Sequence, residues 1–183
     1  YLIPRAESVR AVKDRTAFQW KQEFEWDQNE ALYGLGSYEE GIFNYRHHHQ
    51  YMYQQNMRAV VPCLVSTKGY GVLFDSYSFM TFHDDVYGSY VWSDVNDQLE
   101  YYFIYGPEFD DIVSGYRYLT GQAPMFPKWA FGYIQSKERY TSQEELLAVV
   151  KEYRRRQIPL DVIVLDWMSW EGNYWGQKSL DPA

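Results

Sequence analysis

The stretch 127–166 constrains the fold more than any other part of this chain. It begins with a short apolar run, residues 129–134, broken only by Gly132. Such a run predicts a strand that is buried on both faces. A second run, residues 162–165, is purely aliphatic and mostly β-branched, and it predicts another strand.

A helix is predicted between these two runs. Its start carries two overlapping capping-box patterns, Ser142 with Glu145 and Thr141 with Glu144, and either could open the helix. Apolar residues then recur at helical spacing, cations occupy the last turn, and Pro159 ends the helix. A strand, a helix and a strand within roughly forty residues form a βαβ unit, which requires a parallel sheet and a right-handed crossover.

Asp166 stands at the end of the second predicted strand. In parallel α/β sheets and barrels, ligands bind at the carboxyl ends of the strands, so this position points toward a site. The alternative is that Asp166 caps a loop or the start of a helix. The neighbouring Trp167 and Trp170 favour a pocket that holds a ligand with apolar faces.

Composition limits the classes of partner. Of the 183 residues 20% are aromatic, including 19 tyrosines and 7 tryptophans, and this raises the expectation of a carbohydrate ligand. The formal net charge of −8, with no long basic run, argues against nucleic acid. No apolar stretch approaches the ~20 residues that span a bilayer, so no membrane partner is expected.

Cysteine and histidine usage predicts neither a disulfide nor a metal site. Cys63 is alone and lies in the apolar context V-V-P-C-L-V, which is typical of a buried small hydrophobe. The three histidines at 47–49 cannot converge on one ion, because adjacent strand residues point to opposite faces. No cofactor is expected. The lone thiol and the absence of a signal-like start favour a cytoplasmic protein, and the ends at Tyr1 and Ala183 suggest a piece of a longer polypeptide.

The chain before residue 107 reads as a series of short strands. One strand is expected within residues 1–30, a tight turn or close backbone approach at Gly34 and Gly36, and a hairpin from 60–65 and 70–74. Such spacing indicates an antiparallel sandwich. Pro107 suits a first helical position, and an apolar stripe predicts a helix over 107–120. The predicted domains are therefore a β-sandwich over 1–106, a connecting helix and linker over 107–126, and an α/β region over 127–183.

Several blocks of sequence together resemble glycoside hydrolase family 31, which contains α-glucosidases and α-xylosidases. These blocks are the Gly34–Gly36 pattern and the segments 61–75, 101–110, 115–133 and 160–167, in the family's order. The resemblance implies a β-sandwich followed by the start of a (β/α)8 TIM barrel, namely its first strand, first helix and second strand. It also implies retaining hydrolysis of α-linked glucose or xylose from non-reducing ends.

The resemblance assigns roles to residues at both barrel strands. Asp166 matches the aspartate that hydrogen-bonds hydroxyls of the sugar in the −1 subsite. Trp167, with Trp170 three residues on, is similar to the pattern in α-xylosidases. The segment 134–140 matches the loop after the first strand, which makes Gln135, Arg139 and Tyr140 candidate lining residues, with turn structure and solubility as the alternative role. In the sandwich loop that reaches the leaving-group sugar, the family has an acidic residue where this chain has Asn56.

The catalytic pair is not expected within this chain. Retaining hydrolysis needs two carboxyl groups about 5–5.5 Å apart, and in the family both are aspartates on later barrel strands. The resemblance therefore implies that the chain is inactive alone and that its partners are the remainder of the catalytic barrel and an α-glucoside or α-xyloside. Homo-oligomerisation is left open. The alternative is a noncatalytic carbohydrate-binding or structural protein on the same scaffold.

Overall fold

The computed structural model describes residues 2–13, 15–172, 174–177 and 179–180, so the chain ends Tyr1 and Ala183 lie outside the described residues. The chain divides into two compact units, residues 1–122 and 123–183, and each is described by itself. No helix among the described residues has the length and apolar character that crossing a bilayer requires.

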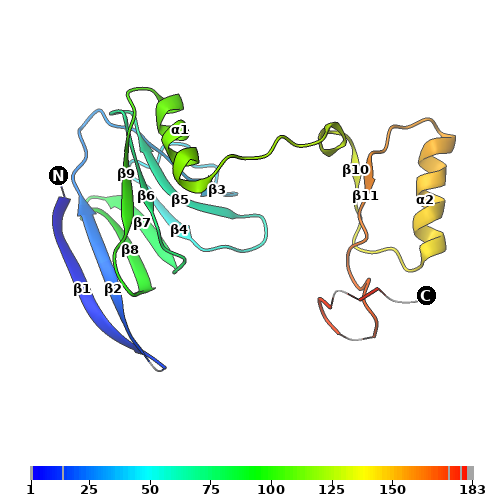
Figure 1. The fold of residues 1–183 in the computed structure, drawn as a ribbon, viewed down its shortest axis with the longest axis horizontal. Helices are drawn as coiled ribbons and strands as arrows, with labels where there is room; N and C mark the ends of the chain where they lie inside the picture. The colour runs from blue at the N-terminus through cyan, green and yellow to red at the C-terminus, as the bar shows by residue number, and fades with distance from the viewer. Residues whose placement is uncertain (1, 14, 173, 178, 181–183) are drawn as a thin grey trace. The chain divides into compact units, whose positions relative to one another are not determined.

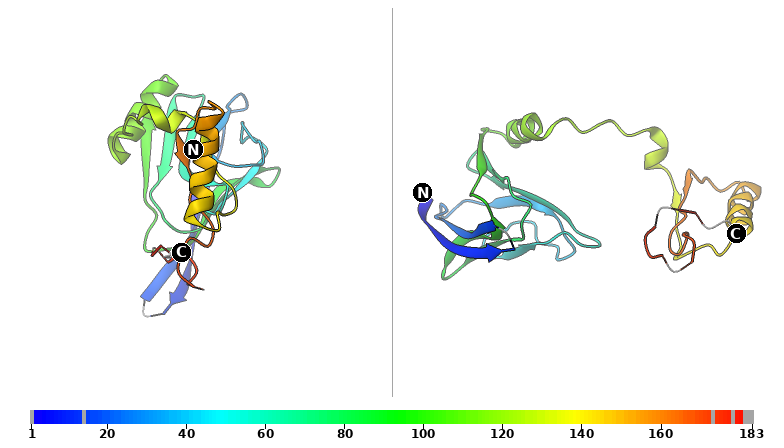
Figure 2. Two further views of the ribbon diagram at one scale, coloured as in Figure 1. Left: turned by 90° about the vertical axis from the view of Figure 1, so that its right-hand side faces the viewer. Right: turned by 60° about the horizontal axis from the view of Figure 1, so that its bottom comes forward.

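Two antiparallel sheets face each other in the first unit and form a β-sandwich, as the sequence predicts (Figures 1 and 2). One sheet has the strand order β1-β2-β8-β7-β4 and the other β3-β5-β6-β9. The strands are β1 (Leu2–Val12), β2 (Arg15–Phe24), β3 (Leu32–Ser37), β4 (His49–Met52), β5 (Ala59–Ser66), β6 (Tyr70–Phe74), β7 (Met80–Asp85), β8 (Gly88–Asn96) and β9 (Tyr101–Tyr105).

The core of the sandwich lies between the two sheets and is rich in aromatic rings. Trp20 from one sheet stacks on Phe74 from the other, with ring centroids 5.9 Å apart. Both side chains are 1% exposed, so each contributes the full benefit of burying a large apolar surface. Around them pack further buried residues: Leu32, Leu35, Tyr45, Met52, Leu64, Val72, Met80, Phe82 and Val91.

The predicted hairpin of residues 60–74 is confirmed, because β5 and β6 pair antiparallel from Cys63 opposite Leu73 to Ser66 opposite Tyr70. The first thirty residues contain two strands and not one. β1 and β2 pair over their whole length, whereas β8 pairs with β2 only from residue 18 onward. The start of β2 and the end of β1 therefore extend as a ribbon past the neighbouring strands (Figure 2).

Gly34 and Gly36 lie in strand β3, where the close backbone approach predicted from the sequence occurs. The register shifts between them, so Leu35 is the extra residue of a bulge and points into the core, where it is fully buried. A Cβ at Gly34 would lie 2.2 Å from the carbonyl oxygen of Cys63, and one at Gly36 would lie 2.0 Å from that of Ala59. Only glycine therefore fits at either position.

Helix α1 (Phe109–Thr120) covers the outer face of the sheet β3-β5-β6-β9. Ile112 is 1% exposed and packs against Gly71, and Gly115 lets the helix approach Ile104. The helix begins later than predicted, because Glu108 is its N-cap and forms a capping box with the side chain and backbone of residue 111. Pro107 thus precedes the cap and is not the first helical residue.

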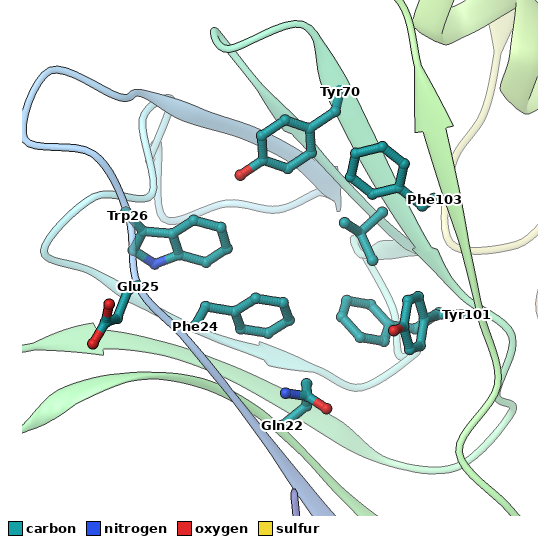
Figure 3. A pocket seen from close by; sticks show the side chains of 9 residues that line it. Gln22, Phe24, Glu25, Trp26, Tyr70, Tyr101 and Phe103 are labelled. Atoms are coloured by element: carbon teal, nitrogen blue, oxygen red, sulfur yellow. The ribbon is translucent and has the colours of Figure 1, made fainter. Parts of the chain in front are cut away.

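An aromatic cleft of about 240 Å³ opens between the sheets beside strand β9 (Figure 3). Phe24 and Trp26 line it from the β2 side, and Tyr101 and Phe103 line it from β9. Strand β9 pairs only with β6 and so leaves one backbone edge unpaired within the described sheet. The cleft and this edge form an apolar margin of the sandwich.

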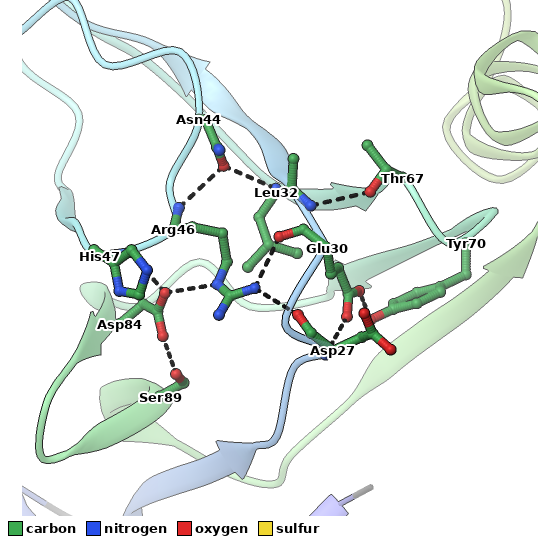
Figure 4. A network of polar contacts seen from close by, with 11 residues as sticks. Asp27, Glu30, Leu32, Asn44, Arg46, His47, Thr67, Tyr70, Asp84 and Ser89 are labelled. Carbon is green, nitrogen blue, oxygen red and sulfur yellow. Dashed lines mark hydrogen bonds and ion pairs between the residues drawn. The ribbon is translucent and has the colours of Figure 1, made fainter.

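A network of polar contacts ties the two sheets together at one end of the sandwich (Figure 4). The Arg46 guanidinium donates to the Asp84 carboxylate at 2.9 Å and to the carbonyl oxygens of Asp27 and Glu30 at 2.9 and 2.8 Å. The buried Glu30 carboxylate accepts from the Tyr70 hydroxyl at 2.5 Å. Loops between strands, and strands of both sheets, are therefore held by charged hydrogen bonds.

Asp84 is the most buried charge in this network, with 5% of its side chain exposed. Burial by itself would raise the pKa of the Asp84 carboxyl, but hydrogen bonds from the Ser89 hydroxyl, the His47 backbone N–H and Arg46 together lower it. The carboxylate is consequently ionised across the neutral range. A buried charge of this kind is tolerated only while its partners stay in place.

Replacing Arg46 with methionine should therefore destabilise the chain. The substitution leaves the Asp84 carboxylate buried without its counter-ion, and the free energy of unfolding should fall by about 3 kcal/mol in urea denaturation. The matched control is Arg15→Met, which removes an exposed pair with Asp97 at 3.9 Å and should cost less than about 1 kcal/mol. Equal losses in the two variants would show that the network adds nothing beyond a surface ion pair.

Candidate functional site

Helix α2 (Gln143–Arg155) organises the second unit. Its N-cap is Ser142, whose hydroxyl accepts the backbone N–H of Glu145 at 3.2 Å, so the serine half of the first predicted capping box forms, without, among the described contacts, the reciprocal bond from the Ser142 N–H to Glu145. The Glu145 carboxylate turns back to the Thr141 backbone N–H at 2.6 Å and to Lys137 Nζ at 2.7 Å. At the other end, Arg154 donates to the Leu160 carbonyl oxygen and fixes the chain's return toward the sheet.

The predicted βαβ arrangement is present in the second unit. Strands β10 (Ile134–Gln135) and β11 (Val162–Ile163) pair in parallel, with α2 as the connection between them (Figure 1). The bond from Val164 N–H to the Gln135 carbonyl oxygen extends the ladder by one step. Since the strands are parallel, their carboxyl ends open onto the same edge.

The first strand is shorter and later than the sequence analysis predicts. Residues Lys128–Phe131 form a 3₁₀ turn, in which the Ala130 N–H bonds to the Pro127 carbonyl oxygen and the Gly132 N–H to that of Trp129. The prediction of burial on both faces is also wrong for this chain: Phe131 and Ile134 are 74% and 47% exposed. A pair of short strands with one helix covers only one face of the sheet.

Gly132 permits the turn into strand β10. The Asp161 carboxylate accepts the Tyr133 backbone N–H at 3.1 Å and lies where a side chain at position 132 would lie, with a Cβ there only 2.0 Å from the carboxylate oxygen. The Tyr133 carbonyl oxygen in turn accepts from Asp161 and Val162. These contacts, which we call the Gly132–Asp161 interlock, align strands β10 and β11 at the residues where the two strands begin.

The loops that follow the two strands are joined to each other. The Trp167 backbone N–H donates to the Glu138 carbonyl oxygen at 3.0 Å. Arg139 Nη1 lies 3.1 Å from the Met168 sulfur. The predicted site residue Arg139 is therefore brought to the Asp166 loop, where its guanidinium contacts the side chain of Met168, a residue with a positive φ of 52°.

Asp166 lies at the carboxyl end of β11, where its exposed carboxylate lines a hollow of about 280 Å³. Within the described residues this carboxylate accepts no hydrogen bond from protein. The other lining residues of this Asp166 hollow are Leu165, Ser169, Trp170, Gly176, Gln177, Ser179 and Leu180. The hollow thus combines one free anion with neutral hydrogen-bonding groups and an indole ring.

Three tryptophan rings gather beside the hollow. Trp167 makes edge-to-face contacts with Trp170 at 5.4 Å and with Trp175 at 4.1 Å between ring centroids. Such pairs are worth about 0.5–1.5 kcal/mol beyond the area that they bury. The two tryptophans named in the sequence analysis are therefore brought together, and the ring of Trp175 is a further member that it missed.

Gln135 and Tyr140 lie elsewhere in the second unit and do not line the Asp166 hollow. The Gln135 side-chain oxygen accepts from the hydroxyls of Tyr133 at 2.6 Å and Tyr153 at 2.7 Å. Its amide nitrogen donates to the Tyr140 hydroxyl at 3.4 Å, and Tyr140 is buried. Because Tyr153 belongs to α2, this polar cluster joins strand β10 to the helix.

Asn56 is in the exposed loop between β4 and β5 of the first unit and is not among the residues that line the Asp166 hollow. The described residues include no cluster of three or more His, Cys, Asp or Glu side chains that could hold a metal ion. The site's chemistry thus consists of a carboxylate that can accept hydrogen bonds from hydroxyls, next to apolar ring faces.

Comparison with known proteins identifies the family. A profile described as "Glycosyl hydrolases family 31 TIM-barrel domain" matches residues 123–183. The chain is 42% identical over 178 residues to an alpha-xylosidase of Saccharolobus solfataricus, and the match covers 92% of this chain. The chain belongs to glycoside hydrolase family 31. It spans 24% of the length of that relative.

Solved structures of family 31 proteins have the same fold. A family 31 alpha-xylosidase from a soil metagenome, complexed with xylose, is 30% identical and has a TM-score of 0.78 over 91% of this chain and 25% of its own. The alpha-xylosidase of Xanthomonas citri has a TM-score of 0.85 at 22% identity, over 97% of this chain and 36% of its own. At that identity the likeness speaks to the fold alone.

Two features of the candidate site had little or no signal in the sequence. Trp175 was not predicted as a neighbour of Trp167 and Trp170, because no regular element connects the third ring to the other two. The contact of Glu138 with Trp167 uses a backbone carbonyl oxygen, for which side-chain identity carries no information. This backbone contact therefore could not be predicted from the residue types at 138 and 167.

The contacts at the start of α2 should stabilise the chain less at acid pH than at neutral pH. Contacts from Lys137 and from the backbone and hydroxyl of Thr141 lower the pKa of Glu145 to about 2. A lowered pKa means that the stabilisation is present above the ordinary value of 4.5 and is lost as pH falls toward 2. Over that window the thermal midpoint of Glu145→Gln, followed by circular dichroism, should fall less than that of the parent chain.

The exposed Glu171→Gln serves as the control for this experiment, and its acid response should match that of the parent chain. If Glu145→Gln loses stability over the same window as steeply as the parent does, the contacts at the helix start are not the source of the acid response.

Proposed function

We propose that this chain is part of a retaining, exo-acting α-glycosidase that releases α-linked xylose or glucose from the non-reducing ends of oligosaccharides. The observation that carries the proposal is the free carboxylate of Asp166 beside three tryptophan rings, at the carboxyl end of a parallel strand. The alpha-xylosidase names of the Saccharolobus solfataricus and soil-metagenome relatives favour xylose.

The proposed role of the second unit is to begin a (β/α)8 barrel. In that role β10, α2 and β11 are the first strand, first helix and second strand, and their loops border the substrate. The parallel pairing of β10 with β11 and the match of residues 123–183 to the family's barrel domain support this role. The exposed faces of Phe131 and Ile134 would pack against the remainder of the barrel.

Asp166 is proposed to orient the sugar in the −1 subsite. An ionised carboxylate can accept hydrogen bonds from two adjacent hydroxyls, and charge-assisted bonds of this kind are roughly twice as strong as neutral ones. The faces of Trp167 and Trp170 would wall the sugar ring, and Arg139 would hold the Asp166 loop through Met168. Asn56, with an amide in place of a carboxylate, would serve the leaving-group sugar.

The catalytic pair is proposed to come from outside this chain. Retaining hydrolysis uses two carboxyl groups about 5–5.5 Å apart, and Asp166 is the only carboxyl group among the described residues that line its hollow. The 183-residue chain alone should therefore show no turnover of aryl α-xyloside or α-glucoside. Turnover by the rigorously purified chain would contradict this part of the proposal.

The test of the site uses the whole protein and its Asp166→Ala variant. Loss of two charge-assisted hydrogen bonds should lower kcat/KM for aryl α-xyloside by about a hundred- to ten-thousand-fold. Glu171→Ala, a nearby exposed carboxylate that does not line the Asp166 hollow, should keep nearly full activity. Unchanged kcat/KM in Asp166→Ala would reduce Asp166 to a structural role, and an inactive whole protein would favour a noncatalytic sugar-binding function.

A further inference from the structure

Another concave surface is lined only by residues of the first unit, and none of the residues that line the Asp166 hollow belongs to it. It is a groove of about 740 Å³ at the end of the sandwich, bordered by the end of β4, the connection from β6 to β7, and the last turn of α1. Its volume is within the range of about 300–1,000 Å³ that is usual for ligand sites, and it exceeds twice that of the Asp166 hollow, about 280 Å³.

Four tyrosines line this surface, which we call the tyrosine groove: Tyr53, Tyr77, Tyr102 and Tyr116. They come from the β4–β5 loop, the β6–β7 connection, strand β9 and helix α1. Tyr77 is fully exposed, and Tyr53 and Tyr102 are 55% and 44% exposed. Within the described part of the chain no hydrogen bond is formed by the four hydroxyls, which are therefore available to a ligand. The rings differ: Tyr53 contacts Phe79 edge-on and Tyr116 packs against buried residues under α1, whereas Tyr77 and Tyr102 offer the more accessible faces.

The walls of the tyrosine groove are held in place by local hydrogen bonds. The Gln54 side-chain oxygen accepts the Val60 backbone N–H at 3.0 Å and braces the β4–β5 loop. Across the groove, the Ser76 hydroxyl donates to the Asn96 side-chain oxygen at 2.6 Å, and the Ser78 hydroxyl accepts the Val95 N–H at 2.9 Å. A preformed surface loses little conformational entropy when a ligand binds.

The charge of the tyrosine groove limits the chemistry of its ligand. None of the described residues that line it is Lys, Arg or His, and its single charged group is the Asp75 carboxylate. An anionic ligand such as a phosphate would meet no counter-ion there. Within the described contacts Asp75 accepts no side-chain hydrogen bond, so its oxygens are available to neutral hydroxyl donors.

We propose that the tyrosine groove is a second carbohydrate-binding site, one that holds a neutral oligosaccharide chain. Tyrosine rings spaced along a groove offer apolar faces to successive sugar rings, while their hydroxyls and Asp75 bond the sugar hydroxyls between them. The site goes beyond the proposed hydrolysis, on which it depends only for the choice of sugars to test. It would keep a chain-like substrate bound to the sandwich and raise its concentration near the protein.

Calorimetric titration of the 183-residue chain with xyloglucan, isomalto- and malto-oligosaccharides of four to six sugar units tests the proposal. At least one of these probes should bind, and Tyr77→Ala and Tyr102→Ala should each weaken its binding tenfold or more. Tyr87→Ala is the matched control, because Tyr87 is 95% exposed on the β7–β8 turn and does not line the groove. Circular dichroism of each variant checks that the fold is intact.

The variant Asp166→Ala separates the two sites. Binding to the tyrosine groove should be unchanged in it, whereas hydrolysis by the whole protein should be lost. Absence of binding by every probe at millimolar concentration, any dependence of the affinity on Asp166, or equal weakening by Tyr87→Ala would overturn the second site. None of these results would bear on whether the whole protein hydrolyses α-xylosides, so the two proposals fail independently.

Discussion

The parallel pairing of β10 with β11 is the constraint from which the candidate site follows. A parallel pair cannot be closed by a tight turn, so the chain must cross over through α2 before it returns. The crossover delivers both carboxyl ends to one edge, where the backbone contact between Trp167 and Glu138 joins the two loops. The free carboxylate of Asp166 is a consequence of that geometry and not of any local sequence motif.

In the sandwich, a few buried charged side chains hold the loops between strands through hydrogen bonds. The Arg46 guanidinium donates to the Asp84 carboxylate on strand β7 of one sheet and to the Glu30 carbonyl oxygen, just before strand β3 of the other. The Glu30 carboxylate in turn accepts from the hydroxyl of Tyr70 on strand β6 of that second sheet. Each charge is costly to remove from water, and the surrounding hydrogen bonds offset that cost.

Elements with a local sequence signal could be predicted, whereas those that depend on contacts with neighbouring elements could not. The β5–β6 hairpin and the Ser142 cap follow from turn and capping chemistry, and both are present as predicted. The run 129–134 has strand composition, yet the turn after Pro127 makes its first half a 3₁₀ element. Composition alone could not reveal this.

The site residues divide in the same way. The end of a strand is visible in a sequence, so Asp166 and its tryptophan neighbours could be named in advance. Successive side chains of a strand point to opposite faces of the sheet, but the sequence does not say which face Gln135 takes. In the structure its side chain bonds three tyrosine hydroxyls, one of them from α2, and so lies on the face that the helix covers. The tyrosine groove joins four separate elements and has no sequence signature at all.

The interlock of Gly132 with Asp161 has a consequence for how this part of the molecule can change over evolutionary time. The carboxylate occupies the space that a side chain at 132 would need, and it accepts the hydrogen bond that starts the strand. A side chain at position 132 therefore requires the Asp161 carboxylate to shift or to be replaced, and either change removes the present acceptor of the Tyr133 N–H. A residue other than glycine at position 132 should therefore be tolerated only together with a change at position 161, 29 residues further along the chain.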